Sequence, residues 1–287
     1  MHLTNRFATR FWRAALTCYG RGTPSHPGKW RVLNLLTPYA SPAWSTPRIA
    51  LCNGIRFELD LSDHIQRNIY FRNCEALETR FLRRLVKPGW VAVDAGANIG
   101  YYSLLFSKLV GPGGIVYAFE PSEDNWINLC KTIMLNSPTN LRAFKLALSD
   151  ACGKTAIVAG PPGSLGKARL DSIGLQGSSS ADQVTLDSFA AQNAIARLDV
   201  MKVDIEGCEE RLLIGAAKTI ERFRPVLLME LNPQALDAFR TTAENLIARL
   251  RRHGYQLFRL TWFGLKPFHR LEREVEFINI IATPEGR

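Results

Sequence analysis

The stretch Val91-Ala-Val-Asp94-Ala-Gly96-Ala-Asn98-Ile-Gly100-Tyr-Tyr-Ser103 decides the fold of this chain. Its pattern predicts a short buried strand that ends at Asp94, a tight turn, and a helix that begins near Gly100. Glycines at 96 and 100 leave room for a ligand, because neither carries a Cβ that would hold it away from the backbone. In an open α/β sheet, such a turn lies at the carboxyl ends of the strands, where ligands bind.

The chemistry of this turn distinguishes two classes of cofactor. A dinucleotide places its pyrophosphate on a G-x-G-x-x-G turn, whereas this chain has Gly-x-x-x-Gly preceded by Asp94. That carboxylate would repel a pyrophosphate and would suit a ligand with an ammonium group and no phosphate. S-adenosylmethionine (SAM), with its amino-acid tail and sulfonium, is such a ligand. A nicotinamide dehydrogenase is therefore disfavoured, and the chain has no GxxxxGK[ST] motif for a P-loop.

Polar residues also follow the next two predicted strands. Glu120 follows the strand Ile115–Phe119, 20 residues after the second glycine of the turn. This spacing places it beside the turn, where it can accept hydrogen bonds from both ribose hydroxyls. Ser149 and Asp150 follow the predicted strand Leu141–Leu148. Asp150 could accept a hydrogen bond from the adenine amino group, or the pair could form a local turn or cap; both interpretations stay open.

Two further acids follow the fourth predicted strand, Val200–Val203. The side chains of Asp204 and Glu206 point to the same side of an extended chain, next to the first turn. There they could orient a sulfonium, accept a proton from an acceptor hydroxyl, or hold a divalent cation. Glu209 is better explained as a first-turn charge that the dipole of the following helix favours. Asp204 is therefore the first candidate catalytic residue and Glu206 the second.

The order of elements predicts the fold class. Strands and helices alternate along most of the chain, which implies an α/β fold with a mostly parallel sheet covered on both faces. Two closing strands, Tyr255–Leu260 and Val275–Ile281, have no helix between them, so we expect them to pair antiparallel. The Gly-, Ser- and Pro-rich residues 159–183 are expected to form a long loop. One domain is expected over residues 63–287.

The basic character of the chain belongs to its N-terminal part. Residues 1–57 contain eight Lys or Arg residues and no Asp or Glu, against a net charge of +10 for the whole chain. The expected elements are a helix (1–19), irregular chain (20–47), a hairpin (48–59) with a type I′ turn at Asn53-Gly54, and a helix (63–86). The basic helix could pack on the domain, contact a membrane surface or another anionic partner, or act as a mitochondrial presequence. We treat residues 1–62 as an extension.

The composition, 46% hydrophobic and 22% charged over 287 residues, is that of an ordinary globular protein and excludes disorder for the bulk of the chain. No apolar run reaches the roughly 18 residues that a membrane span needs. Six cysteines and five histidines are scattered, so neither a disulfide scaffold nor a zinc site is expected. These features predict a protein of the reducing cytoplasm without a bound metal.

Five motifs read together resemble the FkbM family of SAM-dependent methyltransferases. In the family's order they are Asp94-Ala-Gly-Ala-Asn-Ile-Gly-Tyr-Tyr-Ser103, Phe119-Glu-Pro121, Ala147-Leu-Ser-Asp150, Thr185-Leu-Asp-Ser-Phe189 and Lys202-Val-Asp-Ile-Glu-Gly207. The resemblance covers roughly residues 63–231. It implies a class I methyltransferase fold, a Rossmann-like sheet of seven strands in which the last is antiparallel.

The resemblance also implies roles for individual residues. It implies a SAM site made by Asp94, Gly96, Asn98, Gly100, Tyr101, Glu120, Ser149 and Asp150, and a transfer site made by Asp204 and Glu206. The implied reaction is O-methylation of a hydroxyl on a sugar, a polyketide or a related small molecule. An RNA methyltransferase stays open as an alternative, although amino-methylating enzymes of this fold have an Asp/Asn-Pro-Pro-aromatic element where this chain has Asp204-Ile-Glu-Gly207. A module that binds SAM without catalysis is a second alternative.

Overall fold

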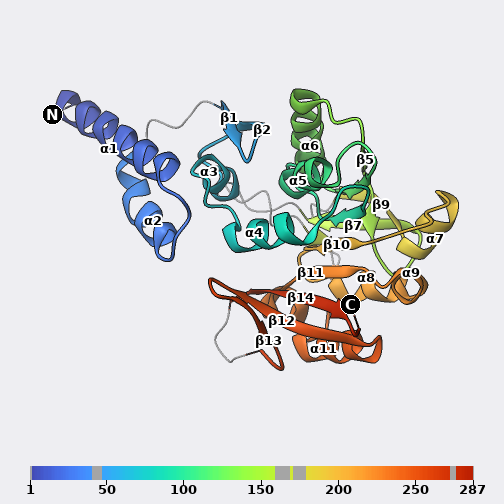
Figure 1. Ribbon diagram of the computed structural model, residues 1–287. Coiled ribbons are helices and arrows are strands. Elements are labelled where there is room, and N and C mark those ends of the chain that lie inside the picture. Colours follow the sequence, from blue (N-terminus) through green and yellow to red (C-terminus); the bar gives the residue numbers. More distant parts are fainter. Residues whose placement is uncertain (1, 41–46, 159–168, 171–178, 272–275, 287) are drawn as a thin grey trace.

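An eight-stranded sheet forms the centre of the computed structural model, which describes residues 2–40, 47–158, 169–170, 179–271 and 276–286. Its strand order is β13-β12-β14-β11-β10-β3-β4-β5 (Figure 1). The strands are β3 (Val91–Ala95), β4 (Ile115–Phe119), β5 (Leu141–Phe144), β10 (Val200–Val203), β11 (Val226–Leu231), β12 (Tyr255–Thr261), β13 (Gly264–Pro267) and β14 (Ile278–Pro284).

The directions of these strands confirm the predicted topology. Strands β3, β4, β5, β10 and β11 pair in parallel, whereas β14 is antiparallel to both β11 and β12. Seven strands therefore have the arrangement of class I methyltransferases, with an antiparallel last strand. The edge strand β13, antiparallel to β12, is an addition that the sequence did not indicate.

Each face of the sheet has its own core, because successive side chains of a strand point to opposite faces. Ala92, Val200 and Val226 pack on one face, under α4 (Ala76–Leu85) and α5 (Tyr101–Val110). Val93 and Met201 pack on the other face. The helices there are α7 (Leu186–Gln192), α8 (Glu209–Gly215), α9 (Ala217–Phe223), α10 (Pro233–Ala238) and α11 (Ala243–Arg252). This double coverage explains why β3, β10 and β11 are almost continuously buried.

A second, four-stranded sheet corrects two expectations. The single strand predicted over 141–148 divides, so that β5 stays in the main sheet and β6 (Ala147–Leu148) pairs in parallel with β9 (Ser179–Val184). The remaining strands of this sheet are β7 (Gly153–Val158) and β8 (Arg169–Leu170), in the order β6-β9-β7-β8. The loop expected over 159–183 is therefore wrong at β8 and over residues 179–183, which form all of β9 but its last residue. Its other residues lie outside the described part of the chain.

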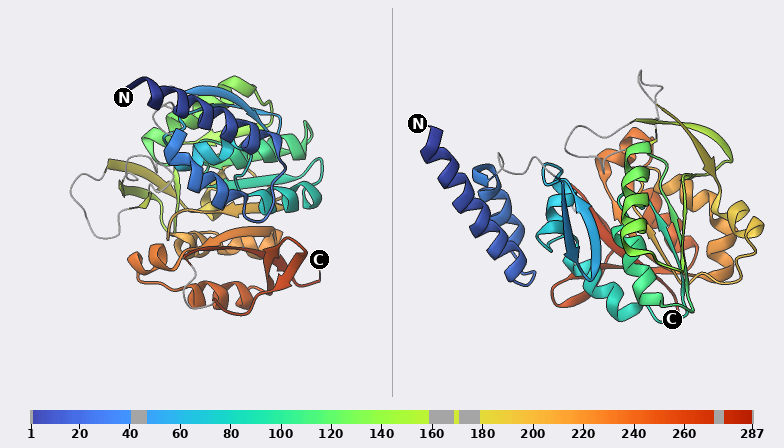
Figure 2. Two further views of the ribbon diagram at one scale, coloured as in Figure 1. Left: turned by 90° about the vertical axis from the view of Figure 1, so that its left-hand side faces the viewer. Right: turned by 90° about the horizontal axis from the view of Figure 1, so that it is seen from above.

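The N-terminal part contains two helices, α1 (His2–Gly22) and α2 (Lys29–Ala40), which lie side by side (Figure 2). Irregular chain over 20–47 is therefore wrong for α2. The helix forms because Lys29 is fully buried and donates to the Thr23 carbonyl oxygen at 2.8 Å, while Leu33 joins the core. The hairpin β1 (Arg48–Cys52) and β2 (Ile55–Leu59) is confirmed, and positive φ angles at both turn residues fit its predicted turn type.

The helix predicted over 63–86 is interrupted. It consists of α3 (His64–Tyr70), whose N-cap Asp63 accepts from the Gln66 backbone N–H, and α4. Between them Arg72 and Glu75 have left-handed φ angles of 55° and 40°. The break brings Glu75 to the carboxyl ends of the strands of the main sheet, at the cavity described below.

Other helix boundaries shift only slightly. Helix α6 (Glu123–Asn136) begins after a Ser122 N-cap, which directly follows Pro121. Asn232 caps α10, since its side chain accepts from the Ala235 backbone N–H. Within the described residues, no helix is both long and apolar enough to cross a membrane.

Candidate functional site

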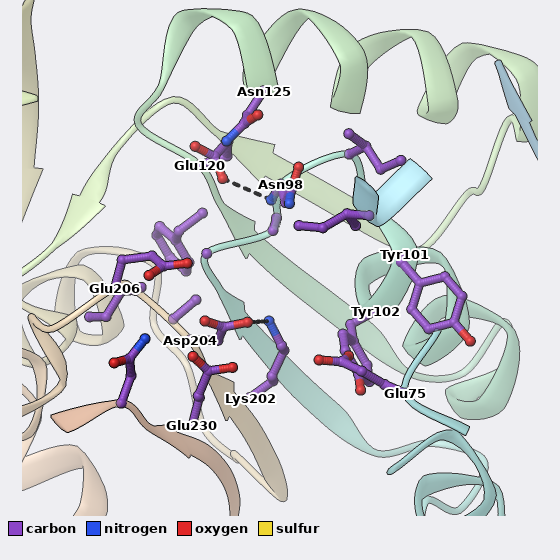
Figure 3. Close-up of a pocket in the computed structure, with 18 of the residues that line it drawn as sticks. Glu75, Asn98, Tyr101, Tyr102, Glu120, Asn125, Lys202, Asp204, Glu206 and Glu230 are labelled. Atoms are coloured by element: carbon purple, nitrogen blue, oxygen red, sulfur yellow. Dashed lines mark hydrogen bonds and ion pairs between the residues drawn. The ribbon is translucent and has the colours of Figure 1, made fainter. Parts of the chain in front are cut away.

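A cavity of about 610 Å³ opens at the carboxyl ends of β3, β4, β10 and β11 (Figure 3). Six of the ten predicted site residues line it: Gly96, Asn98, Tyr101, Glu120, Asp204 and Glu206. The other four, Asp94, Gly100, Ser149 and Asp150, are not part of the wall. Side chains from strand ends far apart in sequence therefore meet at one place, as expected for a parallel sheet.

The turn after β3 is held between its two neighbouring strands. The backbone N–H groups of Gly96 and Ala97 donate to the carbonyl oxygen of Phe119 at 3.0 and 2.9 Å. Gly96 has a φ of 81°, and a Cβ at this position would lie 1.9 Å from the carbonyl oxygen of Asp204. Only glycine fits here, because the turn after β3 and the segment after β10 are in direct contact.

Glu120 is buried at the end of β4 and accepts two backbone hydrogen bonds. Its Oε2 accepts from the Asn98 N–H at 2.7 Å and its Oε1 from the Ser122 N–H at 2.9 Å. Burial raises the pKa of Glu120 to about 7, although these bonds and the Asn125 side chain favour the charged form. A carboxylate offers about four lone-pair positions and these three donors occupy three of them, so this group can still accept a hydroxyl donor from the cavity.

Asp94 lies under the turn rather than in the cavity wall. It is fully buried, and the Ser103 hydroxyl donates to its Oδ2 at 2.5 Å, which ties β3 to α5. Its other oxygen, Oδ1, is buried with no hydrogen-bond partner in the described part of the chain. Burial raises the pKa of Asp94, while Lys202 opposes that shift.

Lys202 is the functional residue that sequence reasoning missed most clearly. It is buried opposite Asp94 in the β3–β10 register, and its ammonium donates to Asp204 Oδ2 at 2.9 Å. The same ammonium lies 4.9 Å from the centre of the Tyr102 ring. Burial lowers the pKa of Lys202, but Asp204, Asp94 and Glu75 raise it by more, so the lysine stays charged. A lysine in the otherwise apolar Val-Met-Lys-Val strand was the available signal.

Two acids that were not predicted complete the wall beside Lys202. Glu75 comes from the break between α3 and α4, and Glu230 comes from β11 (Figure 3). Burial raises the pKa of both carboxyls, and Asp204 raises them further, while Lys202 has the opposite effect. The cavity is thus rich in carboxyl groups around one buried ammonium. Among the described residues, no group of three or more His, Cys, Asp or Glu side chains is arranged to hold a metal ion.

The segment after β10 has an unusual backbone. Glu206 has a left-handed φ of 53° and lines the cavity. Glu209 lies in the first turn of α8, as the sequence suggested. It is buried, and its Oε1 accepts from the N–H groups of Ile205 and Gly207 at 3.1 and 3.2 Å. Burial raises the pKa of Glu209 to about 7. This carboxyl group therefore holds the turn that presents Glu206.

Ser149 and Asp150 directly follow the wall residue Leu148; Ser149 is buried and Asp150 is exposed. The Ser149 hydroxyl donates to Asp150 Oδ1 at 3.0 Å, and its backbone N–H donates to the Val184 carbonyl oxygen. Leu146 and Leu148, which precede them, do line the cavity. The contacts of the pair thus have the form of a local turn, and a role near adenine stays a prediction.

Comparisons with known proteins agree with this geometry. The family model described as "Methyltransferase FkbM domain" matches residues 94–257. The chain is 28% identical over 159 residues to the 31-O-demethyl-FK506 methyltransferase FkbM of Streptomyces tacrolimicus, which covers 45% of this chain and 60% of that enzyme. It is 24% identical over 185 residues to the hexuronic acid methyltransferase AglP of Haloferax volcanii, which covers 64% of this chain and 74% of that enzyme.

One solved structure aligns with much of this chain. The crystal structure of methyltransferase FkbM from Methylobacillus flagellatus KT aligns with a TM-score of 0.44 at 15% identity, covering 79% of this chain and 56% of that chain. The chain thus spans about 60% of the length of the FK506 methyltransferase and just over half of this solved chain.

Proposed function

The chain belongs to the FkbM family of SAM-dependent methyltransferases, and on this premise we propose that it transfers the methyl group of SAM to a hydroxyl of a small acceptor such as a sugar or a polyketide. One observation carries the proposal. Glu120, hydrogen-bonded to the Asn98 N–H, stands in one cavity with Asp204 and Glu206. Carboxyl groups on neighbouring strand ends suit a cationic, phosphate-free nucleoside and would repel a diphosphate.

The residues of the cavity fit SAM in their chemistry. We assign the ribose to Glu120, whose carboxylate can accept a hydroxyl donor beyond its three protein partners, and we place the cofactor against the turn Gly96–Asn98. Asp94 and Asp204 supply negative charge for the ammonium and sulfonium groups. Tyr101 lines the cavity, and its hydroxyl is held by Asn53 and Thr79 at 2.8 and 2.9 Å, so we assign it a positioning role.

Methyl transfer from SAM does not require a covalent bond between the protein and the substrate. Bound SAM supplies a methyl group activated by a sulfonium, so the residues mainly have to hold the acceptor oxygen in place. We assign Asp204 as the group that takes the proton of the acceptor hydroxyl, with Glu206 as the second candidate. Lys202 fixes the Asp204 carboxylate through its 2.9 Å hydrogen bond. This pairing orients the proposed base in the absence of substrate.

The names of the relatives support a small acceptor. One relative is named for 31-O-demethyl-FK506 and another for a hexuronic acid. In this chain the acceptor would meet walls from α3, β11 and the small sheet, represented by His64, Glu230 and Leu170. These residues lie outside the five motifs, so the acceptor can differ from those of the relatives.

We also propose that residues 1–62 are an extension of a catalytic domain over 63–287. The extension folds against that domain, since the Arg56 N–H donates to Asn136 Oδ1 at 2.9 Å and Leu33 joins the core with α5. All six cysteines are free, which supports our proposal of a reducing, cytoplasmic environment.

The proposal is tested by incubating the protein with methyl-labelled SAM and with sugar and polyketide fractions of a cell extract. We expect label in a small hydroxyl compound and none in RNA. Calorimetry should show binding of SAM and none of NADH. Label in RNA would establish the nucleic-acid alternative. Tight SAM binding without label in any fraction would favour a module that binds the cofactor without turnover.

A further inference from the structure

The two N-terminal helices leave an apolar stripe uncovered. On α2, Val32, Leu35 and Tyr39 are spaced three and four residues apart and therefore share one face. Leu35 is 72% exposed and Tyr39 is 58% exposed. On α1, Phe11 is 59% exposed. The ring of its neighbour Trp12 packs against the Tyr39 ring, with 5.8 Å between the two ring centres. The stripe thus continues from one helix to the other.

The stripe has a basic border. Arg10 and Arg31, one on each helix, are exposed next to it. No Asp or Glu occurs in residues 1–57, so no acidic side chain of this segment offsets the charge. Aromatic and aliphatic side chains flanked by arginines, without acids, are the composition of helices that lie in the surface of an anionic bilayer.

The helical pair is fixed to the body of the protein. Leu16 and Leu33 are buried in the core that includes α5. The Arg21 guanidinium donates to the Tyr70 carbonyl oxygen at 2.9 Å. Gly20 packs so closely on Phe71 that a Cβ would lie 2.3 Å from its ring. The exposed stripe therefore belongs to a helical pair that is attached to the body of the protein, and Figure 2 shows both helices at one end of the molecule.

We propose that this stripe, Phe11, Val32, Leu35 and Tyr39 with its bordering arginines, docks the protein on an anionic lipid surface. Trp30 at the start of α2 is half exposed and also lines the large cavity. Docking through α1 and α2 therefore brings the rim of the cavity close to the bilayer. The proposal does not depend on the methyl-transfer reaction.

The test is co-sedimentation of the full chain with vesicles of phosphatidylcholine, with and without phosphatidylglycerol. We expect binding to the anionic vesicles that weakens as salt rises. A variant with Arg10→Gln and Arg31→Gln should bind about 25-fold more weakly, since each basic residue near an anionic surface contributes about fivefold. A variant with Phe11→Ser and Leu35→Ser should lose about tenfold or more, because it removes apolar area that enters the interface.

The matched control is Phe263→Ser, which removes a 98% exposed phenylalanine from the turn between β12 and β13. It should bind vesicles as the unmodified protein does. Unchanged SAM binding in all variants would show that they fold. Equal binding to neutral and anionic vesicles, or full binding by the Phe11→Ser, Leu35→Ser variant, would overturn the proposal. The proposal would also be overturned if the protein did not bind vesicles but formed a dimer in solution that the Phe11→Ser, Leu35→Ser variant no longer forms. The stripe would then be an interface between two copies of the chain.

Discussion

Replacing the buried ammonium in the site should destabilise the whole protein. Lys202→Met removes the partner of Asp204 and the cation that offsets Asp94 and Glu75. Breaking a buried ion pair from one side costs about 3–5 kcal/mol, because a charge is left without compensation. For a chain of this size, about 2 °C of melting temperature corresponds to each kcal/mol. We therefore expect the melting temperature to fall by about 6–10 °C at pH 8.

The cost should depend on pH in a defined direction. Burial already raises the pKa of Asp94 and Glu75, and Lys202 opposes that shift. Without the lysine these pKa values rise further, so the folded variant binds more protons than the unfolded chain. Its stability then increases as pH falls and its carboxyls become neutral. The difference between Lys202→Met and the unmodified protein should accordingly be larger at pH 8 than at pH 6.

The assay is thermal denaturation followed by circular dichroism at both pH values, with urea denaturation for the free energy of unfolding, all without cofactor. The matched control is Lys154→Met, because Lys154 pairs with Asp182 at 2.7 Å on the surface, where the two side chains are 71% and 57% exposed. That change should cost less than about 1 kcal/mol. If Lys202→Met is no less stable than this control at pH 8, Lys202 does not hold the acidic cluster together.

Three further changes test the cofactor turn and the proposed base. In the unmodified protein, SAM affinity should fall about tenfold per pH unit below about pH 7, as the Glu120 carboxyl gains its proton. Glu120→Gln should remove this pH dependence. Calorimetric affinities that depend on pH in the same way for both proteins would contradict the ribose assignment. Gly96→Ala should reduce SAM affinity more than tenfold, because its Cβ meets the Asp204 carbonyl, whereas Gly113→Ala, in open space, should not; equal affinities would refute the close approach. Asp204→Asn should lower kcat about 10²–10⁴-fold with little effect on SAM binding, and full turnover would remove this residue from the reaction.

The sequence predicted the parts of the site that depend on local pattern. The turn around Gly96 and the placement of Glu120 follow from a strand, a glycine turn and a fixed spacing, all visible within about thirty residues. Topology followed from the alternation of strands and helices. Lys202 had one local signal, its place in an otherwise apolar strand, whereas Glu75 and Glu230 had none, because they reach the site from elements far apart in the sequence. Only the folded sheet brings them together around one ammonium.

The errors of secondary structure have the same origin. Gly28 and Pro38 suggested irregular chain. Helix α2 nevertheless begins directly after Gly28 and includes Pro38, because Lys29 and Leu33 are buried against neighbours. The strand over 141–148 divides because β6 finds a partner in β9, a segment more than thirty residues away. Local propensity does not report such distant contacts.

The walls of the cavity come from two separate sheets. Gly96 and Glu120 adjoin strands of the eight-stranded sheet, whereas Leu148 and Leu170 belong to the four-stranded one. Changes in the small sheet can therefore reshape one wall while the proposed cofactor site keeps the backbone hydrogen bonds of the main sheet. Mutation during evolution, or exchange of the four-stranded sheet between homologues by design, could therefore change the acceptor specificity while SAM binding is retained.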